Sequence, residues 1–538
     1  MNFQQKLSKL ATPTASQFVF YATLLSTLLL NISLFSFVVE NVDIATYAGF
    51  AIFFSVLLIV FMLSYILNTL MALISPSLFK VFLLFTTLIN ASAIYYMSTF
   101  NVVLDRAMMG NIFNTRYSEA IELFSITWLM FIVVLGMVPV WLISKIKVSA
   151  VNRLRTLLNM FVVVALSFSF IYFNASSWLW IDKYASVLGG KILPWSYIIN
   201  TSRHFSQQNK STKGQEALPD GAFKDGKKTV VVLVIGETAR SANFSLYGYE
   251  KQTNPKLEQI QRSGNLLVLN DPKACTTYTT GSIACMLSAT ENTSKHEALP
   301  SYLHRQGAEV IWRANNWGEP AIVVDEYVES TPLREQCEQQ GSSNDCHLDG
   351  RLLVNLKERI LTSKKQKVLV VLHTKGSHGP SYYARYTPKF EQFTPVCKSE
   401  EISKCSREEL VNAYDNTILY TDDFLARIVN TLNDLSDNSD IPTAMMYVSD
   451  HGESLGEHGL YLHGTPYSIA PDLQKDVPFL LWMSSSLQAQ KGLSLTEAEQ
   501  ADSHSLFNVF HTVLGLLSFE SDVYQEELDV VDKAKANN

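Results

Sequence analysis

The stretch TVVVLVIGE, residues Thr229–Glu237, decides the fold of the C-terminal part of this chain. It is an apolar run, rich in β-branched residues, that ends abruptly in a carboxylate. Two later runs end similarly: Lys367–Thr374 leads into GSHGP at 376–380, and Thr443–Ser449 leads into Asp450-His451. Strands buried in parallel sheets read as continuous apolar runs, and open α/β sheets carry their functional groups at the carboxyl ends of strands. The sequence therefore predicts an α/β domain whose site is built from strand ends.

Two further runs, Glu309–Ala314 and Pro478–Met483, are expected to be strands of the same sheet. Helical patterns, notably Arg407–Leu432, separate the runs, and such an alternation predicts a layered α/β fold. Upstream, residues 206–228 are polar and read as an exposed linker. They follow a segment whose Trp and Tyr residues suit a membrane interface.

The first 175 of the 538 residues are dominated by apolar blocks and predict a membrane anchor. Each block is close to the roughly 20 residues that a helix needs to cross a hydrocarbon core. A cleaved signal peptide would be shorter than the first block and would end in a small-residue cleavage site. We therefore expect a five-helix transmembrane domain at 1–175, an interfacial segment and linker at 176–228, and a catalytic domain at 229–538. The five blocks are Phe18–Val39, Ala48–Leu70, Val81–Met97, Phe124–Ile143 and Leu157–Phe173.

The charges that flank the blocks predict their orientation. Lys6 and Lys9 precede the first block, Lys145 and Lys147 follow the fourth, and the first connection carries Glu40 instead. Because basic residues favour the cytoplasmic side, the N-terminus is expected in the cytoplasm. An odd number of spans then places the C-terminal domain on the other side of the membrane.

The cysteines point independently to an oxidising compartment. All six lie in the C-terminal domain, in three sequence-local pairs that predict disulfides: Cys275 with Cys285, Cys337 with Cys346, and Cys397 with Cys405. A zinc cluster is the alternative, but the spacings lack the short C-x₂₋₄-C knuckles of such sites. The net charge of −7 argues against nucleic acid as a partner.

A threonine-rich loop, CTTYTTGS at 275–282, is the candidate nucleophile loop. It precedes an expected helix at Ser282–Ser288, whose positive end favours a phosphate or a developing alkoxide. Alone, the loop would be an ordinary Ser/Thr-rich turn. Glu237, Asp450 and His451 supply oxygen and nitrogen ligands from two strand ends, and the Thr279 oxygen completes a four-ligand zinc site. Zinc would activate the threonine hydroxyl, which is otherwise a poor nucleophile.

Two more histidines stand beside glycines in loops, His378 in GSHGP and His463 in LHGTP. Neither lies on an apolar helix face, where a structural histidine would be expected. We expect them to hold a second metal, contact a substrate phosphate or protonate a leaving group.

An external loop, Ser98–Leu123, joins the third and fourth blocks and carries apolar residues at near-helical spacing. It predicts a short amphipathic helix at the bilayer surface. A sharper interpretation is that the polar residues of this helix help to hold a lipid headgroup near the active site.

Several motifs together resemble the phosphoethanolamine transferases, a family that includes the lipid A transferases and the mobile colistin-resistance enzymes. The motifs are GETAR at 236–240, the cysteine-bracketed threonine loop, LHTKGSHGPSYYARY at 372–386, YDN at 414–416 and SDHGESLGEHGLYLHGTP at 449–466. The resemblance covers the whole chain. It implies a soluble α/β domain of the alkaline phosphatase–sulfatase superfamily, with a mixed, largely parallel central sheet between helices.

The resemblance also implies roles for single residues. Glu237, Thr279, Asp450 and His451 match the metal ligands, and Thr279 is the residue that would carry phosphoethanolamine. His378 and His463 match histidines of the outer ligand shell or of a second metal. Asn111 and Thr115 match the headgroup-contacting external loop. One tightly bound Zn²⁺ is implied, with a second allowed during turnover.

The reaction implied is a two-step transfer from phosphatidylethanolamine, through Thr279, to a lipid A phosphate. It would lower the negative surface charge that attracts cationic peptides such as polymyxin. We expect a monomer in the inner membrane of a Gram-negative bacterium, with the catalytic domain in the periplasm.

The alternatives are a core-sugar or protein acceptor, glycerol-phosphate transfer of the lipoteichoic-acid synthase type, a sulfatase and a non-catalytic sensor. The cysteine pairs and GSHGP disfavour the synthase, and no C-x-P-x-R or S-x-P-x-R motif occurs near Thr279 for a sulfatase. A sensor would be expected to have broken metal ligands, whereas every matched ligand is present.

Overall fold

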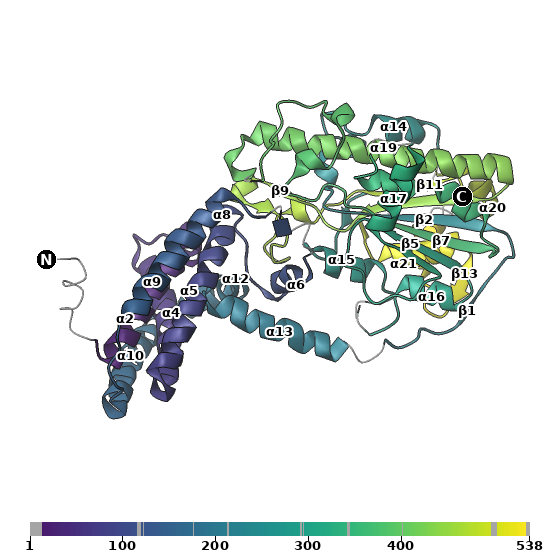
Figure 1. Cartoon of the computed structure of the whole chain (residues 1–538). Helices are drawn as coiled ribbons and strands as arrows, with labels where there is room; N and C mark the ends of the chain where they lie inside the picture. Colours follow the sequence, from purple (N-terminus) through teal and green to yellow (C-terminus); the bar gives the residue numbers. More distant parts are fainter. Residues whose placement is uncertain are drawn as a thin grey trace. The chain divides into compact units, whose positions relative to one another are not determined.

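The computed structural model describes residues 13–115, 120–121, 123–175, 177–211, 215–290, 293, 295–341, 345–400, 402–495 and 503–533. The chain divides into two units, Met1–Phe205 and Ser206–Asn538. Each unit is described by itself below. Figure 1 shows the first unit as a set of long helices and the second as a sheet flanked by helices.

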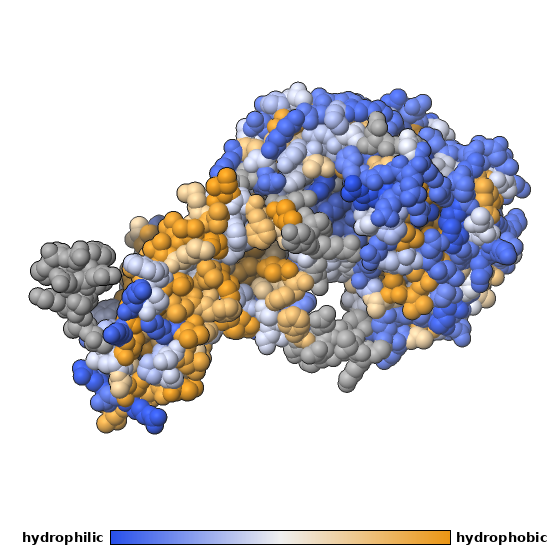
Figure 2. Space-filling view, viewed as in Figure 1, coloured by the Kyte–Doolittle hydropathy of each residue, from blue (hydrophilic) through white to orange (hydrophobic). Residues whose placement is uncertain are grey.

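The first unit is built from apolar helices whose surface is largely hydrophobic (Figure 2). Within the described residues, four helices are long and apolar enough to cross a membrane, and a bent pair brings the number to five. The third of these four helices, Ile126–Lys145, contains a π-helical segment at Ile132–Met137. The elements are α2 (Ala15–Leu30) with α3 (Ile32–Asn41), α4 (Tyr47–Ile74), α5 (Pro76–Thr99), α8 (Ile126–Phe131) with η1 (Ile132–Met137) and α9 (Val138–Lys145), and α10 (Arg153–Phe173).

The first expected span, Phe18–Val39, is not straight: α2 and α3 meet at 57°. The break falls at Asn31, a buried residue whose side chain leaves the helix to bind a distant backbone. Asn31 Oδ1 accepts a 2.8 Å hydrogen bond from Leu193 N, and Asn31 Nδ2 donates to Leu193 O at 3.4 Å. This polar contact explains the interruption of an otherwise apolar helix.

Shorter helices complete the first unit: α6 (Arg106–Asn114), α11 (Ser177–Lys183), α12 (Ala185–Lys191) and α13 (Trp195–Ser211). The helix expected in the external loop is α6, which begins after Asp105. The Asp105 carboxylate caps it by accepting a hydrogen bond from Met108 N at 2.8 Å. Gly110 lies so close to α13 that an added Cβ would be 3.1 Å from the His204 ring.

The second unit is organised by a mixed, largely parallel sheet, as predicted, which has seven strands where the sequence predicts five. Five neighbouring strands are parallel: β8, β2, β7, β5 and β6. Strand β11 runs antiparallel to both of its neighbours, β8 and β3. The order is β3 (Leu266–Val268), β11 (Phe479–Met483), β8 (Thr443–Ser449), β2 (Thr229–Gly236), β7 (Lys367–His373), β5 (Glu309–Ala314) and β6 (Glu326–Val328). Every residue of β2 is buried, as a continuous apolar run in the middle of a sheet requires.

Helices cover both faces of this sheet. The long helix α19 (Arg407–Ser439) lies along one face, and α16 (Leu299–Arg305) and α21 (Asn508–Leu516) lie on the other (Figure 1). The largest hydrophobic cluster joins β2 residues such as Val231, Leu233 and Ile235 to Tyr302 and Phe510. The remaining helices are α14 (Pro255–Arg262), α15 (Thr279–Met286), α17 (Ser330–Gln340), α18 (Leu356–Leu361), α20 (Ser485–Lys491) and α22 (Val530–Lys533).

Small strand pairs tie the edges of the domain together. β1 (Gly221–Phe223), within the expected linker, pairs antiparallel with β13 (Phe519–Ser521). β9 (Ser454–Leu455) and β10 (Tyr461–Leu462) form a hairpin, and β4 (Pro272–Lys273) pairs with β12 (His504–Ser505). The three sequence-local cysteine pairs are bonded as predicted: Cys275–Cys285, Cys337–Cys346 and Cys397–Cys405.

Candidate metal centre

The candidate site lies where two central strands end. β2 and β8 are parallel neighbours, and their register pairs Gly236 with Ser449. The next residues, Glu237 on one strand and Asp450-His451 on the other, therefore emerge side by side at the same edge of the sheet. All three are fully buried. His451 Nε2 lies 3.4 Å from Glu237 Oε1 and 3.3 Å from Asp450 Oδ2.

Thr279 comes to this point from a different segment, as the first residue of α15. Its Oγ1 lies 3.3 Å from both carboxylate oxygens of Glu237 and 3.4 Å from His451 Nε2. The sequence predicts a helix at Ser282–Ser288, whereas the observed helix begins three positions earlier, at Thr279. The hydroxyl thus stands at the positive end of the helix, which favours negative charge there.

His451 and Asp450 are oriented by backbone contacts. His451 Nδ1 lies 2.9 Å from the Gly452 carbonyl, so it carries the proton and leaves the Nε2 lone pair facing Glu237 and Thr279. Asp450 Oδ1 accepts hydrogen bonds from Thr238 N at 3.0 Å and His451 N at 2.7 Å. Asp450 Oδ2 is buried and makes no hydrogen bond to the residues that the structure describes.

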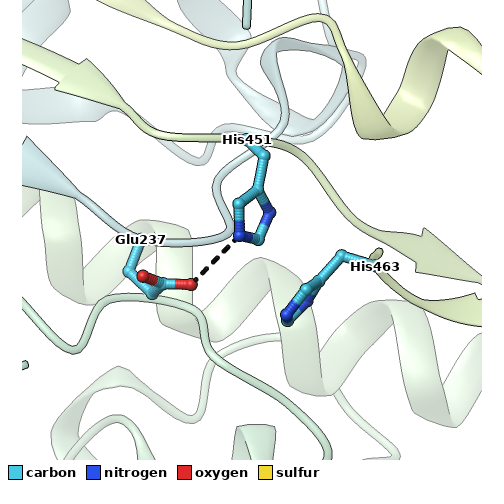
Figure 3. Close-up of side chains that lie close together, drawn as sticks. All are labelled: Glu237, His451 and His463. Atoms are coloured by element: carbon cyan, nitrogen blue, oxygen red, sulfur yellow. Dashed lines mark ion pairs between the residues drawn. The ribbon is translucent and has the colours of Figure 1, made fainter. Parts of the chain in front are cut away.

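His463 joins the same centre. Ligand atoms of Glu237, His451 and His463 all lie within 4.8 Å of one another (Figure 3). The His451 and His463 ring centroids are 4.3 Å apart, and the His378 ring is 5.5 Å from that of His463. The structure therefore brings both predicted loop histidines, His378 and His463, to the strand-end site. The His463 ring lies nearer to the His451 ring than to the His378 ring.

Two polar residues at the site were not predicted from the sequence. Asn316 is buried, and its Nδ2 donates a 2.7 Å hydrogen bond to Glu237 Oε2. Glu453 is also buried, and its Oε1 lies 3.3 Å from His463 Nδ1. The sequence signal for Glu453 was its place two residues after His451, and the signal for Asn316 was its place two residues after the expected strand Glu309–Ala314.

Burial sets the protonation of this cluster. It raises the pKa of Glu237 to about 7, with the charge of Asp450 adding to the effect. It likewise raises the pKa of Asp450 to about 7 and that of Glu453 to about 8. The pKa of His451 falls to about 4, first through burial and then through His463, and burial lowers the pKa of His378 well below its usual value. Burial thus disfavours the charged form of the carboxyl groups and of the His451 and His378 imidazoles alike.

This donor set fits zinc. Imidazole nitrogens and carboxylate oxygens are common Zn²⁺ ligands. Asp450 Oδ2 is buried and accepts no hydrogen bond from the described residues, so it is the kind of atom that a cation would satisfy. Metal binding would also offset the cost of burying two carboxylates side by side. Glu237, His451 and His463 offer ligand atoms within 4.8 Å of one another, Thr279 Oγ1 lies within 3.4 Å of Glu237 and His451, and Asp450 Oδ2 lies 3.3 Å from His451 Nε2.

The two predicted headgroup-contacting residues lie in the other unit. Asn111 is in the last turn of α6, and Thr115 follows the helix and donates a 2.7 Å hydrogen bond from Oγ1 to Asn111 O. Both residues are partly exposed. Their role in binding a headgroup stays a prediction.

Comparison with known proteins covers both units. A family model described as phosphoethanolamine transferase EptA/EptB matches residues 60–209, and a sulfatase model matches residues 229–519. The chain is 36% identical over 469 residues to phosphoethanolamine transferase EptA of Helicobacter pylori, covering 86% of this chain and 87% of the relative. It is 31% identical to phosphatidylethanolamine transferase Mcr-1 of Escherichia coli, covering 84% and 86%. The solved lipooligosaccharide phosphoethanolamine transferase A of Neisseria meningitidis superposes with a TM-score of 0.86 at 29% identity, covering 96% of this chain and 98% of that one.

Proposed function

We propose the function of this chain from its membership of the EptA/Mcr family of phosphoethanolamine transferases. It transfers phosphoethanolamine from phosphatidylethanolamine to a lipid A phosphate, through a covalent intermediate on Thr279. One observation carries the nucleophile assignment. Thr279 Oγ1 stands at the start of α15, 3.3 Å from both Glu237 oxygens and 3.4 Å from His451 Nε2. Among the residues that the structure describes, no other hydroxyl forms hydrogen bonds with both Glu237 and His451.

The same residues would hold the metal. Glu237, Asp450, His451 and the Thr279 oxygen form the proposed Zn²⁺ ligand set, with His463 beside it. When bound, Zn²⁺ supplies positive charge that lowers the pKa of a coordinated hydroxyl and stabilises charge on phosphoryl oxygens. Dependence of the activity on zinc is part of the proposal.

The first half of the reaction breaks the donor lipid. Thr279 Oγ attacks the phosphorus of phosphatidylethanolamine, the bond from phosphorus to the glycerol oxygen breaks, and diacylglycerol leaves with the proton that the threonine loses. The N-terminus of α15 favours the charge that develops on the attacking oxygen. In the proposed mechanism the imidazole rings of His378 and His463, whose centroids are 5.5 Å apart, hydrogen-bond the phosphoryl oxygens or pass the proton to the leaving oxygen.

The second half regenerates the threonine. An oxygen of the acceptor phosphate attacks the same phosphorus, the bond to Thr279 breaks, and the threonine recovers a proton. A lipid A phosphate is the acceptor favoured here because the added ammonium would reduce the negative charge of the outer surface. The solved Neisseria relative is described as a lipooligosaccharide phosphoethanolamine transferase, and lipooligosaccharide is an acceptor of this chemical class. A core sugar is the alternative acceptor.

The location proposed is the inner membrane, with the catalytic unit in the periplasm. The apolar helices support membrane integration, and three disulfides support an oxidising compartment. A solved C-terminal domain of EptC from Campylobacter jejuni, 34% identical with a TM-score of 0.51, is described as periplasmic. We also propose that the chain works as a monomer.

Intact-protein mass spectrometry of the zinc-loaded enzyme in phosphatidylethanolamine vesicles tests the chemistry. The expected result is a phosphoethanolamine adduct on Thr279 together with diacylglycerol release, both lost in Thr279→Ala and both kept in the neighbouring control Thr280→Ala. Lipid A added to the vesicles should discharge the adduct and gain the same mass. An enzyme that released no diacylglycerol, or a Thr279→Ala variant that still released it, would refute the mechanism.

A further inference from the structure

The YDN motif, Tyr414-Asp415-Asn416, has no part in the reaction proposed above. It lies on α19, and all three residues are buried. The Tyr414 hydroxyl donates a 2.8 Å hydrogen bond to Thr238 O and accepts one of 3.0 Å from Arg240 N. One side chain on α19 thus binds the backbone on both sides of Ala239, just after the strand end that carries Glu237.

Thr238 is the residue through which this contact reaches the metal centre. Its φ is +59°, in the left-handed region that β-branched residues rarely adopt. In this conformation its amide donates to Asp450 Oδ1 at 3.0 Å, and its Oγ1 donates to Glu237 Oε1 at 2.6 Å. A single strained residue therefore touches two of the candidate ligands, and strain of this kind persists only where surrounding contacts hold it.

The Tyr414 hydroxyl is itself held rigidly. The Tyr414 ring packs edge-to-face against Tyr382, with centroids 5.5 Å apart, and the Arg240 guanidinium lies 5.5 Å from the Tyr414 ring centroid. Arg240 is anchored in turn by Glu457 at 2.9 Å. Burial raises the pKa of Tyr414 well above its usual value, so the hydroxyl keeps its proton and remains a donor to Thr238 O.

We propose that Tyr414 is a positioning residue of the metal centre. Its hydroxyl holds Thr238 in the left-handed conformation, and Thr238 in turn sets the placement of Glu237 and Asp450 relative to each other. The inference rests on the proposed function in that these two carboxylates are taken to bind zinc. It assigns to Tyr414, the first residue of the YDN motif, a role in metal affinity without contact with the substrate.

The test is the zinc dissociation constant of the full-length protein, measured by competition with a chelator. Tyr414→Phe keeps the ring and removes only the hydroxyl, so we expect about tenfold to hundredfold weaker zinc binding, the usual effect of losing an outer-shell contact. The visible spectrum of the cobalt-loaded variant should shift as well. Thr421→Val is the matched control: it removes another buried hydroxyl of α19, which donates to Thr417 O at 3.0 Å, and should bind zinc as the wild type does.

A second comparison separates positioning from general packing. Glycine adopts a left-handed φ without strain, so in a Thr238→Gly background the Tyr414→Phe change should weaken zinc binding much less than it does in the wild type. An equal loss in both backgrounds, or zinc binding that Tyr414→Phe leaves unchanged, overturns this inference alone. A wild-type protein that bound no zinc would overturn the proposed function and this inference together.

Discussion

At the scale of single residues, the candidate centre depends on side chains that orient the ligands as much as on the ligands themselves. Both oxygens of Glu237 receive a directed hydrogen bond, one from Thr238 Oγ1 at 2.6 Å and one from Asn316 Nδ2 at 2.7 Å. The Asn316 amide is buried, so water does not compete for its hydrogen bond to Glu237. A carboxylate held from both sides in this way presents a fixed direction to a metal.

Asn316→Ala should therefore weaken zinc binding by about tenfold, because Glu237 Oε2 loses the buried donor that fixes its direction. Chelator competition measures the effect. Asn412→Ala is the matched control, since Asn412 is a buried amide that donates to Pro395 O, away from the ligands. Equal zinc affinities for Asn316→Ala and the control would show that Asn316 does not orient Glu237.

At the scale of elements, the polar segment before β2 is fastened to the catalytic fold by charge as well as by strand pairing. Asp225 lies between β1 and β2, and its carboxylate accepts a 2.6 Å hydrogen bond from Lys367 Nζ at the start of β7. The Lys367 side chain is only 2% exposed. A buried ammonium requires such a partner, so the pair joins residues 221–228 to the central sheet.

Asp225→Asn should lower the free energy of unfolding of the catalytic unit by about 2 kcal/mol at pH 7, the scale of a hydrogen bond to a charged group. Burial alone raises the pKa of Asp225, but the hydrogen bond and charge of Lys367 more than offset this and lower it. A lowered carboxyl pKa stabilises the fold above the unfolded pKa of about 4, and that contribution disappears as the pH falls through the folded value.

Urea unfolding, followed by the fluorescence of the buried Trp312 and Trp482, gives the comparison. The difference between wild type and Asp225→Asn should be present at pH 7 and vanish in strong acid. The control Glu520→Gln breaks an exposed ion pair with Lys224 and should cost little at either pH. A difference that persisted unchanged into acid would mean that Asp225 acts through packing rather than charge.

At the scale of the whole molecule, the chain combines two units with separate hydrophobic cores. Among the residues that the structure describes, the main cluster of the catalytic unit lies within residues 218–531, and the clusters of the helical unit lie within residues 18–197. The helical unit also exposes large apolar side chains, such as Ile126 at 80% and Phe173 at 82%, which a bilayer would cover. We propose that this unit brings the two proposed lipid substrates to the catalytic unit within one membrane.

The catalytic unit alone, residues 206–538, should fold and bind zinc with the affinity of the whole chain. Its transfer of phosphoethanolamine to lipid A in mixed vesicles should be slower by about a hundredfold or more, because it loses the effective concentration that a shared membrane provides. Mass spectrometry of lipid A at equal protein concentrations measures the rate, with full-length Thr279→Ala as the background. Transfer at the full-length rate would show that the membrane unit is dispensable for encounter.

Much of the fold follows from local sequence. β2, β5 and β8 have the bounds expected of them, because a strand buried on both faces must be apolar throughout and ends where polar residues begin. The short strands β3 and β6 were not predicted, since three residues at a sheet edge carry no distinct pattern. The bend at Asn31 was also missed, because its cause is a hydrogen bond to Leu193, 162 positions away.

By itself, the sequence determined the membrane anchor, the α/β class, the cysteine pairs and the residue types of the centre, since each depends on composition or on neighbours along the chain. Tertiary structure alone decided how those residues meet. It placed Thr279 at a helix start facing Glu237, brought His463 beside His451, and gave Asn316, Glu453 and Tyr414 their contacts. These contacts join residues that are 10 to 176 positions apart, and only the packing of the sheet and its helices brings such residues together.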